Sequence, residues 1–174
     1  MVYYPPSRRL IFPLKKYSPN NNIFGRVVKN WGVHLGEDVG VLANTEIKCI
    51  CNCQVVYSAL HLGGTDRGNW GGVVIVEHKN SKTKKLFYSL YGHLGKRYCA
   101  AGDQVKKGGC VGLIGQSYTA KNGWWPAHLH FAIYIGPWNG VVLPGYLRPD
   151  SNRTKREYWR DPREFINKYN GTKT

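Results

Sequence analysis

The segment His128-Leu129-His130-Phe131-Ala132-Ile133 alternates histidine or a small side chain with large apolar side chains. A period of two is typical of a β-strand that has one face against a hydrophobic core. In such a strand Leu129, Phe131 and Ile133 point to the core, and the two imidazoles point to the opposite face. The segment therefore predicts a half-buried strand that presents two potential metal ligands.

The rest of the chain repeats this β-type pattern in shorter pieces. Glycine is the most frequent of its 174 residues, with 21 copies, and brief runs of β-branched and aromatic residues lie between glycine-bearing turns. These features predict an all-β fold, mainly antiparallel, in a sheet, barrel or sandwich arrangement. The strands that we expect cover residues 46–58, 72–78, 85–93, either 105–114 or 111–114, and 128–135.

A helix signal occurs near the end of the chain. Asp161 is a suitable N-cap, Pro162 suits the first helical position, and Glu164 suits the third. We therefore expect a short C-terminal helix over residues 161–169. The chain length fits one globular domain. The organisation that we expect is an extended N-terminal arm at 1–24 and a single β-domain at 25–174, which includes that helix and a covering loop at 136–160.

The chain is strongly basic, because 25 Lys and Arg residues against 10 Asp and Glu residues give a formal net charge of +15 at pH 7. Such a charge attracts polyanions. The basic residues are scattered, however, and no zinc-finger spacing, aromatic RNA-binding signature or basic helix accompanies them. We therefore expect a solvated cationic surface, compatible with docking on anionic polymers, and not a nucleic-acid site.

Neither a membrane span nor an export signal is predicted. The longest aliphatic run, Val73–Val76, is far below the ~18–20 apolar residues that cross a bilayer. Pro5, Pro6 and Pro13 interrupt the first twenty residues, whose hydrophobic patch is too broken for the apolar centre of a signal peptide. We therefore expect no membrane insertion and no signal peptide in this chain.

Five cysteines leave at least one thiol outside any intrachain disulfide. Cys49, Cys51 and Cys53 alternate with Ile50 and Asn52, so a strand here would project all three thiols from one face. Structural zinc sites usually pair cysteines across a turn, and thiols in line on a strand fit that geometry poorly. The sequence therefore favours small buried apolar side chains over a thiolate metal site.

Two further segments carry possible metal ligands or proton carriers. Residues 32–40 have a glycine at every fourth position, which disfavours a helix and favours a turn that brings His34 and Asp38 to one ion. His93 directly follows Tyr91-Gly92. Imidazole nitrogen and carboxylate oxygen are zinc ligands, and three protein ligands with a fourth position left to water is the catalytic arrangement.

Three motifs occur in a fixed order: His-x-x-x-Asp at 34–38, Tyr-Gly-His-Leu at 91–94 and His-Leu-His-Phe at 128–131. Each is weak alone, since such short patterns occur by chance. Together and in this order they resemble the signature of the LytM and lysostaphin-type zinc metallopeptidases. The likeness extends from about residue 31 to residue 135.

The resemblance implies a set of site residues. His34, Asp38 and His130 correspond to the ligands of one zinc ion. His93 and His128 correspond to the two catalytic histidines beside the metal. Either of these two can serve as the base or as the stabiliser of the oxyanion, because an imidazole with a pKa near 6.5 can take up or donate a proton near neutral pH.

The resemblance also implies a function and a setting. We expect a zinc-dependent endopeptidase that uses metal-activated water to hydrolyse peptide bonds, in the stem peptides or cross-bridges of peptidoglycan. Such an activity implies the cell envelope or the extracellular space, where anionic wall polymers are possible partners. The alternative is a non-catalytic relative of the same fold that binds the cell wall or activates an amidase, although here every ligand position is filled.

Two departures from the family pattern concern the groove. A tyrosine that some relatives place shortly before the first zinc histidine is absent from residues 26–31, so its role near the oxyanion is unassigned. Residues 124–127, Trp-Trp-Pro-Ala, replace a glycine-rich turn. These tryptophans, with Trp31, Trp70 and Tyr118, either contact a substrate or pack the loops.

The remaining titratable residues near the motifs receive no catalytic role. His61 lies in a polar loop. His78 ends a predicted strand, at a position where relatives carry a histidine that does not bind metal. We expect Glu37 and Asp66 to be solvated.

Overall fold

The computed structural model describes residues 8–149 and 154–171, which contain twelve strands, two short 3-10 helices and one α-helix. Residues 1–7 of the predicted arm and residues 150–153 of the predicted covering loop lie outside the described residues, as do 172–174. The elements are β1 (Val27–Val28), β2 (Gly32–His34), β3 (Glu37–Gly40), β4 (Glu46–Lys48), β5 (Cys53–His61), β6 (Gly71–Lys79), β7 (Leu86–Arg97), β8 (Gln104–Val105), β9 (Cys110–Ile114), η1 (Ala120–Asn122), β10 (His128–Tyr134), β11 (Tyr146–Leu147), η2 (Arg156–Tyr158), β12 (Trp159–Arg160) and α1 (Pro162–Asn170).

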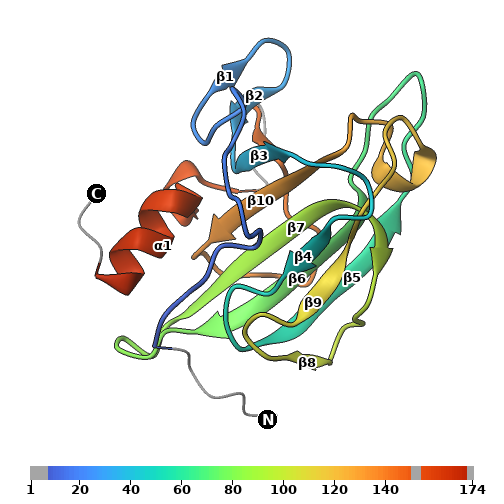
Figure 1. Ribbon diagram of the computed structural model, residues 1–174. Helices are drawn as coiled ribbons and strands as arrows, with labels where there is room; N and C mark the ends of the chain where they lie inside the picture. Colours follow the sequence, from blue (N-terminus) through green and yellow to red (C-terminus); the bar gives the residue numbers. More distant parts are fainter. Residues whose placement is uncertain (1–7, 150–153, 172–174) are drawn as a thin grey trace.

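The main sheet is antiparallel and is built around the long neighbours β5, β6 and β7 (Figure 1). Strand β10 pairs with β7, and both β3 and β12 pair with β10. Strand β9 pairs with the end of β7 and with β4, and β8 pairs with β5. A separate small sheet joins β1, β2 and β11. The predicted all-β, mainly antiparallel fold with a short C-terminal helix is confirmed.

Apolar side chains alternate along β6 into two clusters, one on each face of the sheet. Val74 and Val76 belong to one cluster, and Val73 and Ile75 belong to the other. All four are fully buried. Burial of such a side chain contributes about 1.5–3 kcal/mol relative to its exposure. Strand β6, covered on both faces, therefore lies at the centre of the core.

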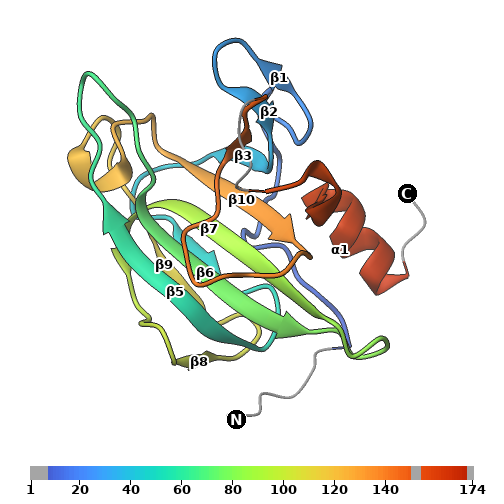
Figure 2. The same ribbon diagram turned by 180° about the vertical axis from the view of Figure 1, so that it is seen from behind.

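Segments from both ends of the chain cover this sheet. Leu10 and Leu14 of the N-terminal segment and Ile166 of α1 pack into the first cluster. Leu143 and Trp159 pack into the second. The chain that follows β10 crosses this second face of the sheet (Figure 2). The apolar residues of the N-terminal segment are thus part of the core.

The structure corrects the predicted strand at residues 46–58. Strand β4 ends at Lys48, residues 49–52 form a bend, and β5 begins only at Cys53. The alternation of cysteine with other residues imitates a strand, but the backbone turns there. The sequence predicted one strand at either 105–114 or 111–114. The structure has two strands in this region, β8 and β9, separated by a turn.

Helix α1 begins and ends with the expected local chemistry. The Asp161 side chain accepts a hydrogen bond from the backbone N–H of Glu164 at 3.0 Å. Gly171 ends the helix with a φ of +75°, a left-handed conformation that favours glycine. No helix within residues 8–149 and 154–171 is long and apolar enough to cross a membrane.

Glu37 joins α1 and the N-terminal segment to β3. Its side chain is fully buried, so the expectation of a solvated Glu37 was wrong. It accepts a hydrogen bond from the Tyr17 hydroxyl at 2.9 Å and pairs with the Arg163 guanidinium at 2.5 Å. Burial raises the pKa of Glu37, while these two partners lower it. The hydrogen bonds from Tyr17 and Arg163 therefore offset the desolvation cost of burying the Glu37 carboxylate, which is next to Asp38 in the sequence.

We expect Tyr17→Phe to lower the free energy of unfolding by about 1–3 kcal/mol, because it leaves the buried Glu37 carboxylate short of one hydrogen-bond donor. Urea unfolding at neutral pH measures the change. The matched control is Tyr98→Phe at an exposed tyrosine, for which a change within about 0.5 kcal/mol is expected. Equal stability of the two variants would contradict the role of the Tyr17 hydroxyl.

Candidate functional site

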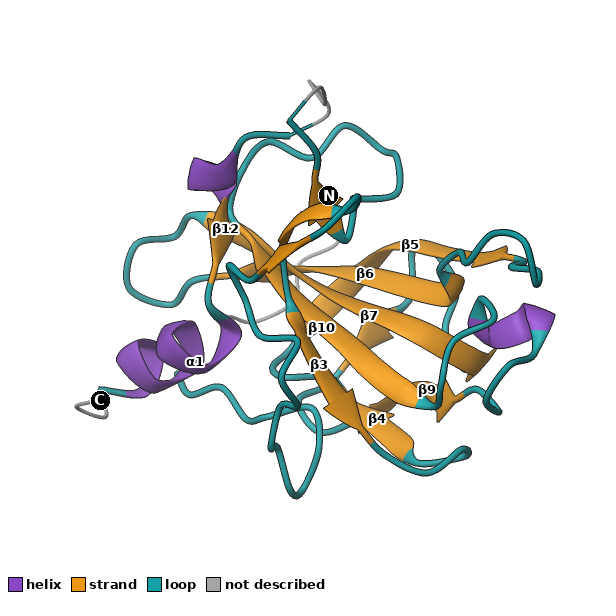
Figure 3. Cartoon of the chain, turned by 90° about the horizontal axis from the view of Figure 1, so that it is seen from above, coloured by secondary structure: helices purple, strands orange, loops and turns teal. Residues whose placement is uncertain are grey.

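Strands β3 and β10 lie side by side and bring two distant motifs together (Figure 3). In their antiparallel register Asp38 lies opposite His130. Directly opposed residues in adjacent strands point to the same face of a sheet, so the carboxylate and the imidazole meet. The pairing of these strands thereby joins residues that are 92 positions apart.

His34 reaches the same place through a tight turn between β2 and β3. The turn passes so close to β10 that a Cβ at Gly36 would lie 2.6 Å from the backbone oxygen of Phe131 and 2.7 Å from Nε2 of His130. Only glycine fits there without displacing backbone. Gly36 therefore allows His34 to lie beside the Asp38–His130 pair.

Three potential ligand atoms converge at this point. Nε2 of His34 lies 3.1 Å from Nδ1 of His130 and 3.4 Å from Oδ1 of Asp38, and Nδ1 of His130 lies 3.0 Å from the same Oδ1. All three residues are buried. A single ion at the usual zinc–nitrogen and zinc–oxygen bond lengths of about 2.0–2.2 Å would touch all three atoms. The donor set therefore fits a zinc ion.

Backbone contacts orient the ligands. Nδ1 of His34 lies 3.2 Å from the carbonyl oxygen of Ile23. Because a carbonyl oxygen only accepts, this nitrogen carries the proton and Nε2 presents its lone pair to the site. Among the described residues, Nε2 of His130 is a buried atom without a hydrogen-bond partner, so this ring lacks the outer hydrogen bond that usually supports a ligating histidine.

His93 and His128 form a second pair beside these atoms. Their ring centroids are 4.3 Å apart, and Nε2 of His128 lies 3.7 Å from Oδ1 of Asp38. Nδ1 of His93 donates to the Asn122 carbonyl at 3.0 Å, and Nδ1 of His128 donates to the Pro126 carbonyl at 2.7 Å. Both rings therefore keep an unprotonated Nε2 when they are neutral.

The backbone of His93 is in an unusual conformation. Its φ is +62°, a left-handed value that is uncommon for residues other than glycine, although histidine, asparagine and aspartate adopt it more often than the rest. Its amide N–H donates to the Trp70 carbonyl and its carbonyl accepts from the Gly115 amide, which hold the conformation in place. Such strain often occurs where a side chain must be aimed at a functional site.

Burial sets the protonation states of the site. It lowers the pKa of His93 well below its ordinary range, and the neighbouring His128 and His130 lower it further. Burial lowers the pKa of His130 to about 4, against the opposing effect of Asp38. Burial alone would raise the pKa of Asp38, but hydrogen bonds with His130 and His34 lower it below its ordinary range. At neutral pH the site thus has neutral His93 and His130 rings beside one carboxylate, as a cation requires.

A cleft of about 430 Å³ opens onto these groups. Trp31, Trp70 and Trp125 form much of its wall, together with Tyr146, while Asp38 and three of the histidines line its floor. The Trp70 ring lies 4.9 Å from that of His130. Tyr118 is exposed and is not among the residues that line the cleft.

The structure places the five predicted site residues, His34, Asp38, His93, His128 and His130, around one point. Their roles stay predictions. His61 lies apart from them and contacts the Tyr57 hydroxyl at 2.9 Å.

Sequence reasoning missed Asn22 and Tyr146. Nδ2 of Asn22 donates to Oδ2 of Asp38 and to the Tyr146 hydroxyl, the latter at 2.9 Å. The Tyr146 ring lies 4.9 Å from that of His34. No motif marks either residue. Asn22 lies in an irregular segment and Tyr146 begins the two-residue strand β11, so the position of each depends on tertiary packing.

The comparisons with known proteins agree with this geometry. A family model described as Peptidase family M23 matches residues 32–142. No curated protein matches the sequence.

Solved structures share the fold. The catalytic domain of lysostaphin from Staphylococcus simulans has 22% identity and a TM-score of 0.56, with 86% of this chain and 92% of that chain covered. LytU has 23% identity and a TM-score of 0.54, with 97% and 90% covered. The whole of lysostaphin has 18% identity and a TM-score of 0.60, with 98% of this chain and 58% of that chain covered, so this chain spans less than two thirds of its length. Similarity at these identities establishes the fold alone.

We expect the metal-free protein to lose stability as the pH falls from about 6.5 to about 4. Folded His130 stays neutral down to about pH 4, whereas a histidine in the unfolded chain takes up a proton near pH 6.5. The unfolded state therefore binds more protons in this interval, and the His130 contribution, on the order of 3 kcal/mol, is lost on acidification.

Urea unfolding of chelator-treated protein at several pH values measures this loss. His130→Asn should make the dependence on pH less steep, although buried His93 and His78 still contribute to it. His61→Asn, at a histidine outside the site, is the control. The same slope in the wild type and in His130→Asn would contradict neutral burial of His130.

Proposed function

Because the chain belongs to peptidase family M23 and is a metallo-endopeptidase, we propose that it hydrolyses peptide bonds in the stem peptides or cross-bridges of peptidoglycan. The coarser class, a peptidoglycan-related zinc metallopeptidase, follows from the family itself. The choice of stem peptides or cross-bridges and the roles of single residues belong to the proposal.

The proposal assigns one zinc ion to His34, Asp38 and His130. The observation that carries it is the approach of one ligand atom from each of these residues to within 3.4 Å of the others, in a buried site at the floor of a cleft. When bound, zinc would lower the pKa of a coordinated water to about 7 and polarise the scissile carbonyl.

His93 and His128 would carry the protons. Both rings hold their Nδ1 proton against a backbone carbonyl, so both present Nε2 as an acceptor. One of them takes the proton of the attacking water, and a protonated ring returns a proton to the nitrogen of the leaving amine. Their ring centroids are 4.3 Å apart, close enough for either ring to reach the same reacting group.

Some relatives carry a tyrosine near the oxyanion, but residues 26–31 contain none. Tyr146 is our candidate for the hydrogen-bond donor to the oxyanion in this chain. Its hydroxyl accepts a hydrogen bond from Nδ2 of Asn22, which leaves its own O–H to donate. Burial raises the pKa of Tyr146, so the hydroxyl stays protonated. A phenol held at the wall of the cleft beside His34 can donate to the negative oxygen that develops on the scissile carbonyl.

The cleft and the charge support a polymeric substrate with an exposed peptide. Three tryptophans line the opening, and aromatic faces bind peptide backbone and sugar rings through apolar contact. The net charge of +15 favours approach to anionic wall polymers. An enzyme with this substrate acts in the cell envelope or outside the cell.

A non-catalytic wall-binding or amidase-activating module is the alternative. It is not favoured, because His34, Asp38 and His130 are all present and converge, and four of the five predicted site residues, all but His34, line the cleft.

We expect His130→Ala to lose both bound zinc and cleavage, since it removes a ligand. His128→Ala should keep the zinc and lose about 10²–10⁴-fold in turnover, the usual worth of a positioned general acid or base. Metal analysis of the purified protein and mass spectrometry of fragments released from purified peptidoglycan measure the two effects and identify the bond. His61→Ala is the matched control and should resemble the wild type. Wild-type protein that releases no peptide fragment from any peptidoglycan would refute the proposed substrate, and cleavage that persists in His130→Ala would refute the ligand set.

We expect Tyr146→Phe to lower kcat by about 10²–10³-fold, the effect of removing one oxyanion donor. KM and zinc content should change little, because the ring remains in the wall of the cleft. Steady-state kinetics on a released peptide substrate measure this separation. Tyr118→Phe, outside the cleft, is the control. An unchanged kcat in Tyr146→Phe would exclude the hydroxyl from the reaction.

A further inference from the structure

A second group of potential metal ligands lies in the core, apart from the cleft residues. Its first members are the thiols of the bend at residues 49–52 and of Cys53, where β5 begins. Cys49, Cys51 and Cys53 are each at most 1% exposed, and none of the five cysteines forms a disulfide. The thiols of Cys49 and Cys53 approach each other to 3.0 Å across the bend. Sequence reasoning disfavoured a metal here because it placed these residues in line on a strand, and the bend removes that objection.

The backbone of the bend is held from several sides. The Cys49 amide donates to the Gly109 carbonyl, and the Cys49 carbonyl accepts from the Gly108 amide. The Ile50 carbonyl accepts from the amide of Ile11, and the Ile50 amide donates to the Tyr91 hydroxyl at 3.2 Å. The positions of the thiols are therefore fixed before any ligand arrives, as a structural metal site requires.

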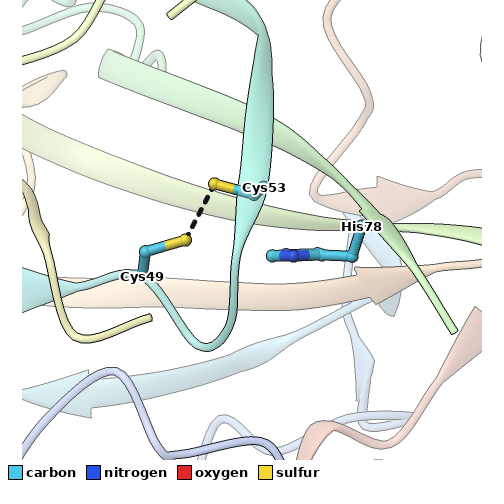
Figure 4. A group of neighbouring side chains, drawn as sticks. All are labelled: Cys49, Cys53 and His78. Carbon is cyan, nitrogen blue, oxygen red and sulfur yellow. Dashed lines mark hydrogen bonds between the residues drawn. The ribbon is translucent and has the colours of Figure 1, made fainter. Parts of the chain in front are cut away.

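His78 of β6 supplies an imidazole to the same place. Its side chain is fully buried and extends from the strand toward the bend (Figure 4). One ligand atom each from Cys49, Cys53 and His78 lies within 4.8 Å of the other two. Nδ1 of His78 is also 3.0 Å from the thiol of Cys51 and 3.2 Å from the carbonyl oxygen of Asn52.

Nε2, the ring nitrogen of His78 that faces away from the thiols, has a hydrogen-bond partner, as is usual in a metal-binding histidine. The Ser89 hydroxyl donates its one proton to the Tyr91 hydroxyl at 3.0 Å. In that arrangement its oxygen accepts from Nε2 of His78, which lies 2.8 Å away. With the ring proton on Nε2, Nδ1 directs a lone pair toward the thiols. With the proton on Nδ1, that nitrogen donates to the Asn52 carbonyl instead, so binding of a metal selects the first tautomer. Such a hydrogen bond on the outer nitrogen is the usual support of a ligating histidine.

We propose that Cys49, Cys53 and His78 bind a second, structural zinc ion. Cys51 lies outside this group of converging atoms, but its thiol is 3.0 Å from Nδ1 of His78, and we assign it as the fourth ligand that turns toward the ion. Three sulfur ligands and one imidazole nitrogen are a common donor set of closed, tetrahedral zinc sites. Sulfurs at about 2.3 Å from a tetrahedral ion lie about 3.7 Å apart, so Cys49 and Cys53 need to separate by less than about 1 Å. Each thiol that binds as thiolate releases its proton to solvent. No oxidant or other reactant is needed.

The site is distinct from the proposed catalytic zinc, because the two ligand sets share no residue. The bend joins β4 to β5, and β6 runs beside β5. A metal here would tie the bend to the central strand of the core. We therefore assign it to stability, with no part in the hydrolysis.

The test begins with the full chain purified without chelator and without added zinc. Metal analysis should find two zinc ions per chain in the wild type. His130→Ala should retain one, held by the thiol site. Cys49→Ala/Cys53→Ala should also retain one and should still cleave peptide, whereas the matched control Cys99→Ala/Cys110→Ala should retain two. A single zinc in the wild type that is lost in His130→Ala would overturn the thiol site and leave the proposed function intact.

Cobalt substitution keeps the test decisive if the double cysteine variant does not fold. Cobalt bound by thiolate has a sulfur-to-metal charge-transfer band in the near ultraviolet, and cobalt bound by imidazole and carboxylate has none. The band should appear in cobalt-loaded wild type and in cobalt-loaded His130→Ala. Its absence from both, or a mass lower by two hydrogens that indicates a Cys49–Cys53 disulfide, would overturn the proposal.

Discussion

The pairing of β3 with β10 is the constraint on which the rest of the site depends. It sets Asp38 opposite His130. The turn at Gly36, which precedes β3, then places His34 beside this pair. Side chains alternate along a strand, so a slip of one residue would turn Asp38 away from the imidazoles and bring Glu37 in its place. The partners of Glu37 oppose that slip, since Tyr17 and Arg163 satisfy a carboxylate only on the far side of β3.

The electrostatics of the site follow from this arrangement. One carboxylate is buried among imidazoles, of which burial keeps His93 and His130 neutral, and Asn22 donates to its second oxygen. The tryptophans of the cleft exclude water from part of the rim, which strengthens the interactions of a charge that forms inside. The cleft thus combines polar catalytic groups with apolar walls. This combination favours a reaction in which negative charge develops on the carbonyl oxygen of a bound amide.

The sequence predicts most of this architecture where local pattern and tertiary structure agree. The period of two at 128–133 locates β10 and the face that carries its histidines, and Asp161-Pro162 marks the start of α1. Prediction failed where contacts between distant parts of the sequence determine the local structure. Alternating cysteines imitate a strand, yet the chain bends at 49–52. Tyr146 meets Asn22 from 124 residues away, and the burial of Glu37 depends on two segments that are far from it in the sequence.

The carboxylate of Glu37 contacts a tyrosine from the N-terminal segment and an arginine from the C-terminal helix, directly behind a ligand of the proposed metal. Both ends of the chain thus help to hold one strand of the site. Shortening either end of this enzyme would remove a contact that holds the strand carrying Asp38. The shortest useful version is therefore longer than the three histidine motifs suggest.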